Sequence, residues 1–200
     1  MTAPDKELPA AARDRRPTPD GRLPGDIDMW VMILGDLFFF GCYFVTYMVF
    51  RAMAADDFST AQRHLHVGIG VTNTIVLLTS SLLAALAVIA VRDGAFSTAR
   101  RLLWATGSCG VLFILIKVYE WRSEISQGHT ISNEFFSFYY VFTGIHLVHL
   151  ALGLLILGVA LRELRDGGRR RTTIVEQSAV FWHMIDLLWV VIFALLYLMR

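Results

Sequence analysis

Five long apolar segments, separated by short polar connections, dominate the hydropathy pattern of this chain after residue 28. They cover about residues 30–50, 67–91, 102–119, 138–161 and 179–199. Each approaches or exceeds the roughly 20 residues that a helix needs to cross a hydrocarbon core of about 30 Å. Only helices and closed barrels satisfy their backbone hydrogen bonds in lipid, and segments this long are helices. The pattern therefore predicts an all-α, polytopic membrane domain of five transmembrane helices over residues 29–200.

The first 28 residues differ from this pattern in composition. They are rich in Pro, Asp and Arg and contain almost no large apolar side chains. Such a segment cannot bury enough apolar surface to fold alone, so we expect residues 1–28 to be a mobile tail. Since the later connections are short, we expect sequential helices to be antiparallel neighbours in one bundle.

Lys and Arg residues are sorted to one side of the predicted bundle. The tail and the connections after the second and fourth apolar segments hold 13 of the 18 such residues. The opposite side holds Arg51, Arg63, Arg122 and Arg200. The positive-inside rule therefore predicts a cytoplasmic N-terminus and tail, and a C-terminus outside the cell.

The overall composition limits the classes of protein that fit. With 56% hydrophobic residues and a mean hydropathy of +0.55, the chain is too apolar for an ordinary soluble domain. A formal net charge of +1 provides no clustered basic face, so no nucleic-acid partner is expected.

Asp36 stands about 6 residues into the first apolar segment, which is roughly 9 Å deep at 1.5 Å per residue. A lone carboxylate at that depth would be protonated, paired, or hydrogen-bonded to a lipid headgroup or water. We therefore keep two hypotheses open, a proton- or lipid-related site and a satisfied structural carboxyl.

The second apolar segment carries small polar residues at Asn73, Thr74, Thr79, Ser80 and Ser81. In membrane helices such residues usually indicate close helix packing. Contact with lipid headgroups is the alternative.

Lys117 and Glu120 stand one helical turn apart near the end of the third apolar segment. At this spacing they can pair. Because both lie near the predicted membrane interface, we expect a pair whose side chains snorkel toward the headgroups.

Histidine recurs in the fourth apolar segment, where His146 and His149 share one helix face. Gly144 and Gly153 on the same segment would let a neighbouring helix approach closely. Two histidines one turn apart also raise the possibility of a metal or haem site. A di-metal bundle would need paired Glu-x-x-His motifs, and the sequence contains none.

The fifth apolar segment carries His183 and Asp186 one turn apart, after Glu176. A charged side chain at the centre of a membrane helix costs roughly 2.5–3.5 kcal/mol, so we expect this face to point into protein. Interhelical hydrogen bonding among His146, His149, His183 and Asp186 is favoured over metal binding.

Motifs in all five apolar segments resemble subunit III of the haem–copper oxidases. The stretch F-W-H-M-I-D-L-L-W resembles the family's closing helix, with its Trp-His-Phe-Val-Asp-x-x-Trp pattern after a Glu. T-G-I-H-L-V-H-L-A-L-G and N-T-I-V-L-L-T-S-S resemble its Thr-Gly-x-His-x-x-His-x-x-x-Gly and Asn-Thr-x-x-Leu-Leu-x-Ser-Ser patterns. Y-E-W and G-D-L-F-F-F-G stand where the family has Tyr-Glu-Tyr and a carboxylate-bearing Ser-Glu-x-x-Phe-Phe. The resemblance runs from about Trp30 to the C-terminus and is to the short, five-helix form, with Asp36 replacing the usual Glu.

The resemblance implies a non-catalytic accessory subunit of a respiratory terminal oxidase, in the inner (plasma) membrane. Such subunits hold no haem or copper, pack beside catalytic subunit I of an enzyme that also contains subunit II, bind phospholipid and sustain proton uptake. We accordingly expect lipid- or proton-related roles for Asp36, Asn73, Ser80 and Ser81. An interhelical polar network is expected from Glu120, His146, His149, Glu176, His183 and Asp186.

Two alternatives remain open. The lead-in P-G-D-I-D-M-W resembles subunit III-like proteins that accompany nitric oxide reductases, which would change the partner enzyme. A haem- or metal-bearing electron-transfer protein, using His146, His149 and His183, is an alternative of another class.

Overall fold

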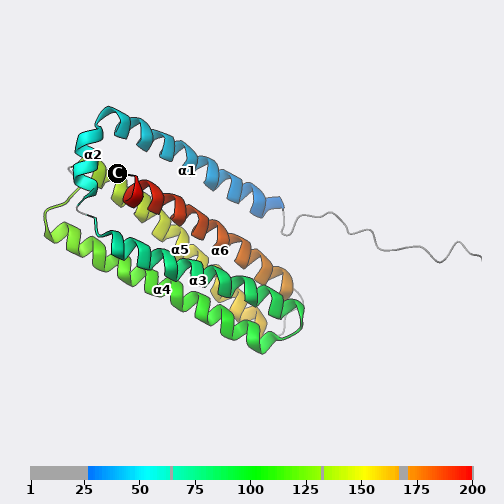
Figure 1. Ribbon diagram of the computed structural model, residues 1–200. Coiled ribbons are helices and arrows are strands. Elements are labelled where there is room, and N and C mark those ends of the chain that lie inside the picture. Colours follow the sequence, from blue (N-terminus) through cyan, green and yellow to red (C-terminus); the bar gives the residue numbers. More distant parts are fainter. Residues whose placement is uncertain (1–26, 64, 132, 167–170, 200) are drawn as a thin grey trace, which may run out of the picture.

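The computed structural model describes residues 27–63, 65–131, 133–166 and 171–199, which form a bundle of helices (Figure 1). The long helices are α1 (Ile27–Met53), α3 (Val67–Arg92), α4 (Phe96–Ser126), α5 (Glu134–Asp166) and α6 (Arg171–Phe193). A short helix, α2 (Ala55–Gln62), follows α1, and a π-helical turn, η2 (Ala194–Leu198), continues α6. Among the described residues, five helices are long and apolar enough to cross a membrane, which confirms the predicted five-helix all-α architecture.

Most of the long helices extend beyond the predicted apolar segments, although α3 begins at the predicted residue, Val67, and α6 with η2 ends at Leu198. The third segment was predicted over residues 102–119, whereas α4 runs from Phe96 to Ser126. Charged residues at both ends lowered the hydropathy there without ending the helix. The predicted tail, residues 1–28, lies outside the described residues except for its last two, which belong to α1.

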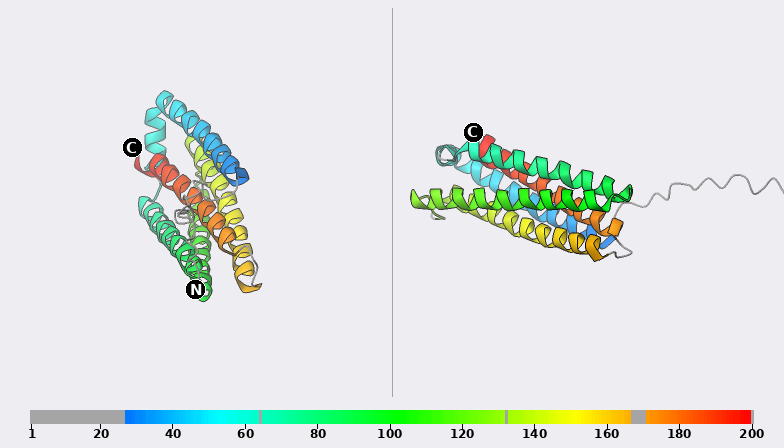
Figure 2. Two further views of the ribbon diagram at one scale, coloured as in Figure 1. Left: turned by 90° about the vertical axis from the view of Figure 1, so that its right-hand side faces the viewer. Right: turned by 90° about the horizontal axis from the view of Figure 1, so that it is seen from below.

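Helices α3, α4, α5 and α6 form a four-helix group, and α1 lies outside it against α5 and α6 (Figures 1 and 2). The expectation that every sequential pair would be neighbours is therefore wrong for the first two long helices. Helix α2 occupies their connection and carries the chain from α1 to α3. Helix α6 is the most enclosed, with 61% of its apolar stretch buried against 17% for α1.

Aromatic rings attach α1 to α5. Tyr43 and Phe44 both pack on Phe142, with ring centroids 4.7 and 5.2 Å apart. One turn further along α1, Tyr47 packs on Phe138 at 5.6 Å. Since residue numbers rise along α1 as they fall along α5, these two helices are antiparallel.

Two glycines let neighbouring helices close around Trp182 of α6. A Cβ on Gly153 of α5 would lie 2.7 Å from Ile185 Cδ1 and 3.1 Å from the Trp182 ring. A Cβ on Gly110 of α4 would lie 2.8 Å from the same ring. The close approach predicted for Gly153 is confirmed, whereas Gly144 leaves ordinary space, 3.6 Å to Trp121.

Helix α2 covers the C-terminal end of α6 and was not predicted from the sequence. The buried Gln62 side chain donates to the Leu196 carbonyl at 2.8 Å, and the Tyr47 hydroxyl donates to the Leu195 carbonyl at 3.2 Å. The last carbonyls of a helix have no partner within it, so side chains from elsewhere must satisfy them when they are buried. Gln62 and Tyr47 do this for η2.

Candidate functional site within the helix bundle

Asp36 of α1 faces His149 of α5 across the boundary between α1 and the four-helix group. Asp36 Oδ2 lies 3.4 Å from His149 Nε2, and the two side chains are 27% and 18% exposed. The other ring nitrogen, Nδ1, donates to the Ile145 carbonyl at 2.9 Å. Because a carbonyl only accepts, Nδ1 carries a proton. The contact between Asp36 and His149 joins α1 to α5, and the role of Asp36 stays a prediction.

Ser80 and Ser81 of α3 join three helices. Trp182 Nε1 donates to Ser80 Oγ at 2.8 Å, and Ser80 Oγ donates to the Thr106 carbonyl of α4 at 3.3 Å. The Ser81 hydroxyl lies 2.7 Å from His183 Nδ1. Ser80 and Ser81 thus make interhelical hydrogen bonds, and a lipid- or proton-related role for them remains a proposal.

Asn73, His146 and Asp186 are buried polar residues on three different helices. Both side-chain polar atoms of each lack a hydrogen-bond partner among the described residues. The hydroxyl of Ser81 is at hydrogen-bond distance from His183 Nδ1. Buried polar groups in folded proteins usually have a hydrogen-bond partner, so these three residues stand out among the buried side chains.

His146 lies in an aromatic layer at the centre of the bundle. Its ring packs on Phe113 at 5.6 Å and on Trp189 at 5.2 Å. Trp189 also donates through Nε1 to Thr74 Oγ1 at 3.1 Å. The histidine is thus enclosed by rings from α4 and α6.

The four residues expected to form one polar network are not hydrogen-bonded to one another in the part of the chain that the structure describes. Within the described part of the chain, no hydrogen bond joins any two of His146, His149, His183 and Asp186. His149 pairs with α1 and His183 with α3 instead. A polar network that joins these four residues therefore stays a prediction.

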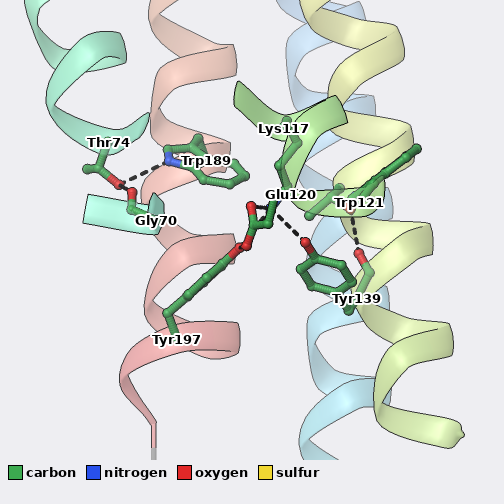
Figure 3. A network of polar contacts seen from close by, with 9 residues as sticks. Gly70, Thr74, Lys117, Glu120, Trp121, Tyr139, Trp189 and Tyr197 are labelled. Carbon is green, nitrogen blue, oxygen red and sulfur yellow. Dashed lines mark hydrogen bonds and ion pairs between the residues drawn. The ribbon is translucent and has the colours of Figure 1, made fainter. Parts of the chain in front are cut away.

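Lys117 and Glu120 of α4 form the most enclosed polar cluster (Figure 3). Lys117 Nζ donates to Glu120 Oε2 at 2.9 Å and to the hydroxyls of Tyr197 and Tyr139 at 2.7 and 3.2 Å. The Tyr197 hydroxyl in turn donates to Glu120 Oε1 at 2.6 Å. All three ammonium protons and both carboxylate oxygens are therefore satisfied by α4, α5 and η2.

The predicted snorkelling of the Lys117–Glu120 pair is wrong. The two side chains are 0% and 1% exposed. Both would reach the headgroups if this end of α4 faced lipid, but Tyr139 and Tyr197 cover it. In the sequence, opposite charges one turn apart in an apolar segment indicated this cluster. Nothing in the sequence indicated that Tyr139 and Tyr197 belong to it.

Glu176 of α6 pairs with Arg92 of α3 at the other end of the bundle. Arg92 Nε donates to Glu176 Oε1 at 2.7 Å, with the side chains 58% and 24% exposed. This contact joins α3 to α6, and the expected role of Glu176 in a polar network stays a prediction. Its exposure makes it worth only about 0–1 kcal/mol.

No group of three or more His, Cys, Asp and Glu side chains converges as a metal ion would require, among the residues that the structure describes. His146 and His149 point to different surroundings, an aromatic layer and Asp36 respectively.

Comparison with known proteins gives matches over nearly the whole chain. The family model described as Cytochrome c oxidase subunit III matches residues 25–200. Cytochrome c oxidase subunit 3 of Thermostichus vulcanus is 29% identical over 185 residues, covering 90% of this chain and 89% of that protein. Heme-copper oxidase subunit I+III of Aeropyrum pernix is 31% identical over 180 residues, covering 85% of this chain and 22% of that protein. Cytochrome c oxidase subunit 3 of Synechocystis sp. is 28% identical over 194 residues, covering 96% and 81%.

Proposed function

This chain belongs to the cytochrome c oxidase subunit III family, and from that membership we propose that it is the non-catalytic accessory subunit III of a respiratory haem–copper terminal oxidase. The observation that carries this proposal is the match over residues 25–200, which takes in all five long helices. In this proposal the haem and copper that reduce oxygen, and the pumping of protons, belong to the partner.

The proposed partner is catalytic subunit I, in an enzyme that also contains subunit II. The relative from Aeropyrum pernix supports this pairing, because its name joins subunits I and III in one polypeptide. The chain aligns with 22% of that protein, as expected if it corresponds to the subunit III part.

We assign the Asp36–His149 pair to the support of proton uptake and to contact with bound phospholipid. The pair is partly exposed and bridges α1 and the four-helix group. A titratable side chain inside a membrane protein is by default a functional candidate because burying it is costly. Asn73, Ser80 and Ser81 are proposed to have lipid- or proton-related roles. Interhelical braces or headgroup contacts are proposed for Glu120, His146, Glu176, His183 and Asp186.

We also propose the inner membrane as the location and the orientation that the Lys and Arg residues predict. With Arg100, Arg101, Arg162 and Arg165 at one end of the bundle, that end faces the cytoplasm under the positive-inside rule. The Lys117–Glu120 cluster and α2 then lie near the outer face.

Deleting the gene and measuring two respiratory activities in native membranes tests this proposal. We expect lower or shorter-lived oxygen consumption, with nitric oxide reduction unchanged. The converse result would favour the nitric oxide reductase partner. Re-expression of the wild-type chain should restore oxygen consumption, which controls for effects on neighbouring genes.

A further inference from the structure

One short segment, the π-helical turn η2, contacts both the α1–α2 unit and the buried Lys117–Glu120 pair. The α1–α2 unit comprises residues 27–62, the first long helix and the short helix that follows it. Within η2, Leu196 and Tyr197 are buried. Single π-helical turns are rare and occur frequently at functional sites. The contacts on the two sides of η2 therefore bear on whether this turn does more than end α6.

The backbone of η2 is hydrogen-bonded to the α1–α2 unit. The Tyr47 hydroxyl donates to the Leu195 carbonyl at 3.2 Å, and Gln62 Nε2 donates to the Leu196 carbonyl at 2.8 Å. Both donor side chains are buried. A buried carbonyl that loses its donor costs free energy until water or another group replaces that donor. Docking of the α1–α2 unit therefore stabilises η2 in the conformation described.

The Tyr197 side chain joins the same turn to α4. Its hydroxyl donates to Glu120 Oε1 at 2.6 Å and accepts from Lys117 Nζ at 2.7 Å (Figure 3). Tyr197 directly follows Leu196, whose carbonyl accepts from Gln62. A backbone rearrangement at Leu196 therefore moves the hydroxyl that covers the ion pair.

Tight packing prevents Tyr197 from adjusting independently of its backbone. A Cβ on Gly70 of α3 would lie 3.0 Å from the Tyr197 ring and 2.8 Å from the Phe193 ring. The rings of Phe193 and Tyr197 stack with their centroids 5.4 Å apart. Closely packed interiors change between discrete arrangements rather than deforming continuously. A shift of η2 therefore withdraws Tyr197 from Lys117 and Glu120 instead of being absorbed by a small ring rotation.

Helix α1 is the long helix that the rest of the described structure encloses least. Only 17% of its apolar stretch is buried, whereas the other four long helices have 28% or more. A segment with little buried apolar surface opens at a lower free energy than the rest of a fold. The α1–α2 unit is therefore the part of the chain that we expect to undock first.

We propose that η2 is a conformational junction that couples docking of the α1–α2 unit to protection of the Lys117–Glu120 pair from water. In the docked state, Tyr197 covers the pair. Undocking withdraws Tyr47 and Gln62 from η2, displaces Tyr197 and opens the pair to water at the nearby end of the bundle. A neighbouring subunit that moves α1 thereby changes the hydration of a charged pair that it does not touch. The coupling is a property of this chain and does not depend on which respiratory enzyme it serves.

Acetylation of lysine amines, followed by mass spectrometry of the full-length chain in detergent, tests this proposal. The chain has two lysines, so Lys6 near the N-terminus serves as the internal reference for Lys117. The double substitution Tyr47→Phe/Gln62→Leu removes both hydrogen bonds to η2 and keeps the approximate size of each side chain. Acetylation of Lys117 relative to Lys6 is expected to rise about tenfold, because each lost hydrogen bond shifts the docking equilibrium several-fold.

The matched control is Ser80→Ala in α3. It removes two interhelical hydrogen bonds, to Trp182 and to the Thr106 carbonyl, and leaves the contacts of η2 unchanged. Acetylation of Lys117 in this variant should equal that of the wild-type chain. An equal rise in Ser80→Ala would mean that the bundle loosens generally, which would contradict the coupling.

A second measurement follows the α1–α2 unit itself. Spin labels on the two cysteines of the chain, Cys42 of α1 and Cys109 of α4, report the distance between that unit and the four-helix group by pulsed electron paramagnetic resonance. We expect a broader distance distribution in Tyr47→Phe/Gln62→Leu. Because coupling is reciprocal, Tyr197→Phe should broaden it too.

Circular dichroism should show unchanged helix content in all of these variants. The proposal would be overturned by a broadened distance distribution in Tyr47→Phe/Gln62→Leu with Lys117 still protected, since the two events would then be uncoupled. An unchanged distribution in that variant would also overturn it, because the hydrogen bonds to η2 would not control docking.

Discussion

Buried polar residues of this bundle differ in whether their side-chain polar atoms are hydrogen-bonded. Lys117 and Glu120 have every donor and acceptor satisfied within the described chain. Asn73 and His146 have none of their polar side-chain atoms satisfied there. Hydrogen-bonded residues such as Lys117 and Glu120 hold neighbouring helices together, whereas Asn73 and His146 place polar atoms without a partner among the described residues in the interior.

Removing one member of the buried ion pair should be far more damaging than removing both. We expect Lys117→Met to lower the free energy of unfolding by about 3–5 kcal/mol, because Glu120 is left charged and buried. The double substitution Lys117→Met/Glu120→Leu should recover a large part of that loss. Thermal unfolding of the detergent-solubilised variants measures both effects.

The exposed pair at the other end of the bundle is the control for this comparison. Arg92→Gln breaks its contact with Glu176 but should cost no more than about 1 kcal/mol, since Arg92 is 58% exposed. Equal melting temperatures for Lys117→Met and Arg92→Gln would contradict the buried-pair interpretation.

Substitution of Asp36 should affect how long the complex works rather than whether it forms. Asp36→Asn keeps the size of the side chain but removes the carboxyl that contacts His149. We expect normal assembly with a partner and faster loss of oxidase activity during turnover. Asp93→Asn, an exposed carboxyl at the end of α3, is the matched control. An unchanged decay rate in Asp36→Asn would remove the functional role assigned to Asp36.

At the scale of helices, the sequence identified elements better than their ends. Five apolar segments were sufficient to predict five long helices because length and hydropathy alone decide whether a segment can span a membrane. Helix α4 proved longer because Arg100 and Arg101 lie inside it, although they interrupt the apolar pattern. Helix α2 has only eight residues, and its burial of Phe58 and Gln62 depends on contact with α5 and η2, which no local pattern shows.

The candidate site could be predicted by residue type but not by partner. Asp36 stood out because a carboxylate in an apolar segment is rare, yet nothing along the chain links it to His149, 113 positions away. The burial of Lys117 was missed because Tyr197 arrives from the far end of the sequence. Partners of this kind depend on how helices are arranged, and that arrangement is a tertiary property.

Two glycines of α5 should respond differently to the same substitution. Gly153→Val places a side chain against Ile185 and Trp182, so we expect a loss of about 1–3 kcal/mol from overpacking. Gly158→Val, five residues further on, enters open space and should be close to neutral. Unfolding of the two variants under identical detergent conditions gives the comparison, and similar losses for both would contradict the packing described for Gly153.

At the scale of the whole molecule, the fold encloses helix α6 among helices that are long enough to span a bilayer. Helix α6 is buried by its neighbours, whereas α1 presents large exposed apolar side chains such as Val31, Phe38 and Val45. Apolar residues facing outward are expected of a chain surrounded by lipid and by other membrane subunits. The match to a subunit family over residues 25–200 agrees with such a setting.

Co-purification tests the proposed identity of the partner most directly. The tagged chain would be isolated from native membranes in mild detergent, its companions identified, and a reduced-minus-oxidised spectrum recorded. We predict haem bands together with a large oxidase subunit I, and loss of those bands when this chain is purified alone. Nitric oxide reductase subunits as the companions, or haem that stays with the isolated chain, would contradict the proposed function.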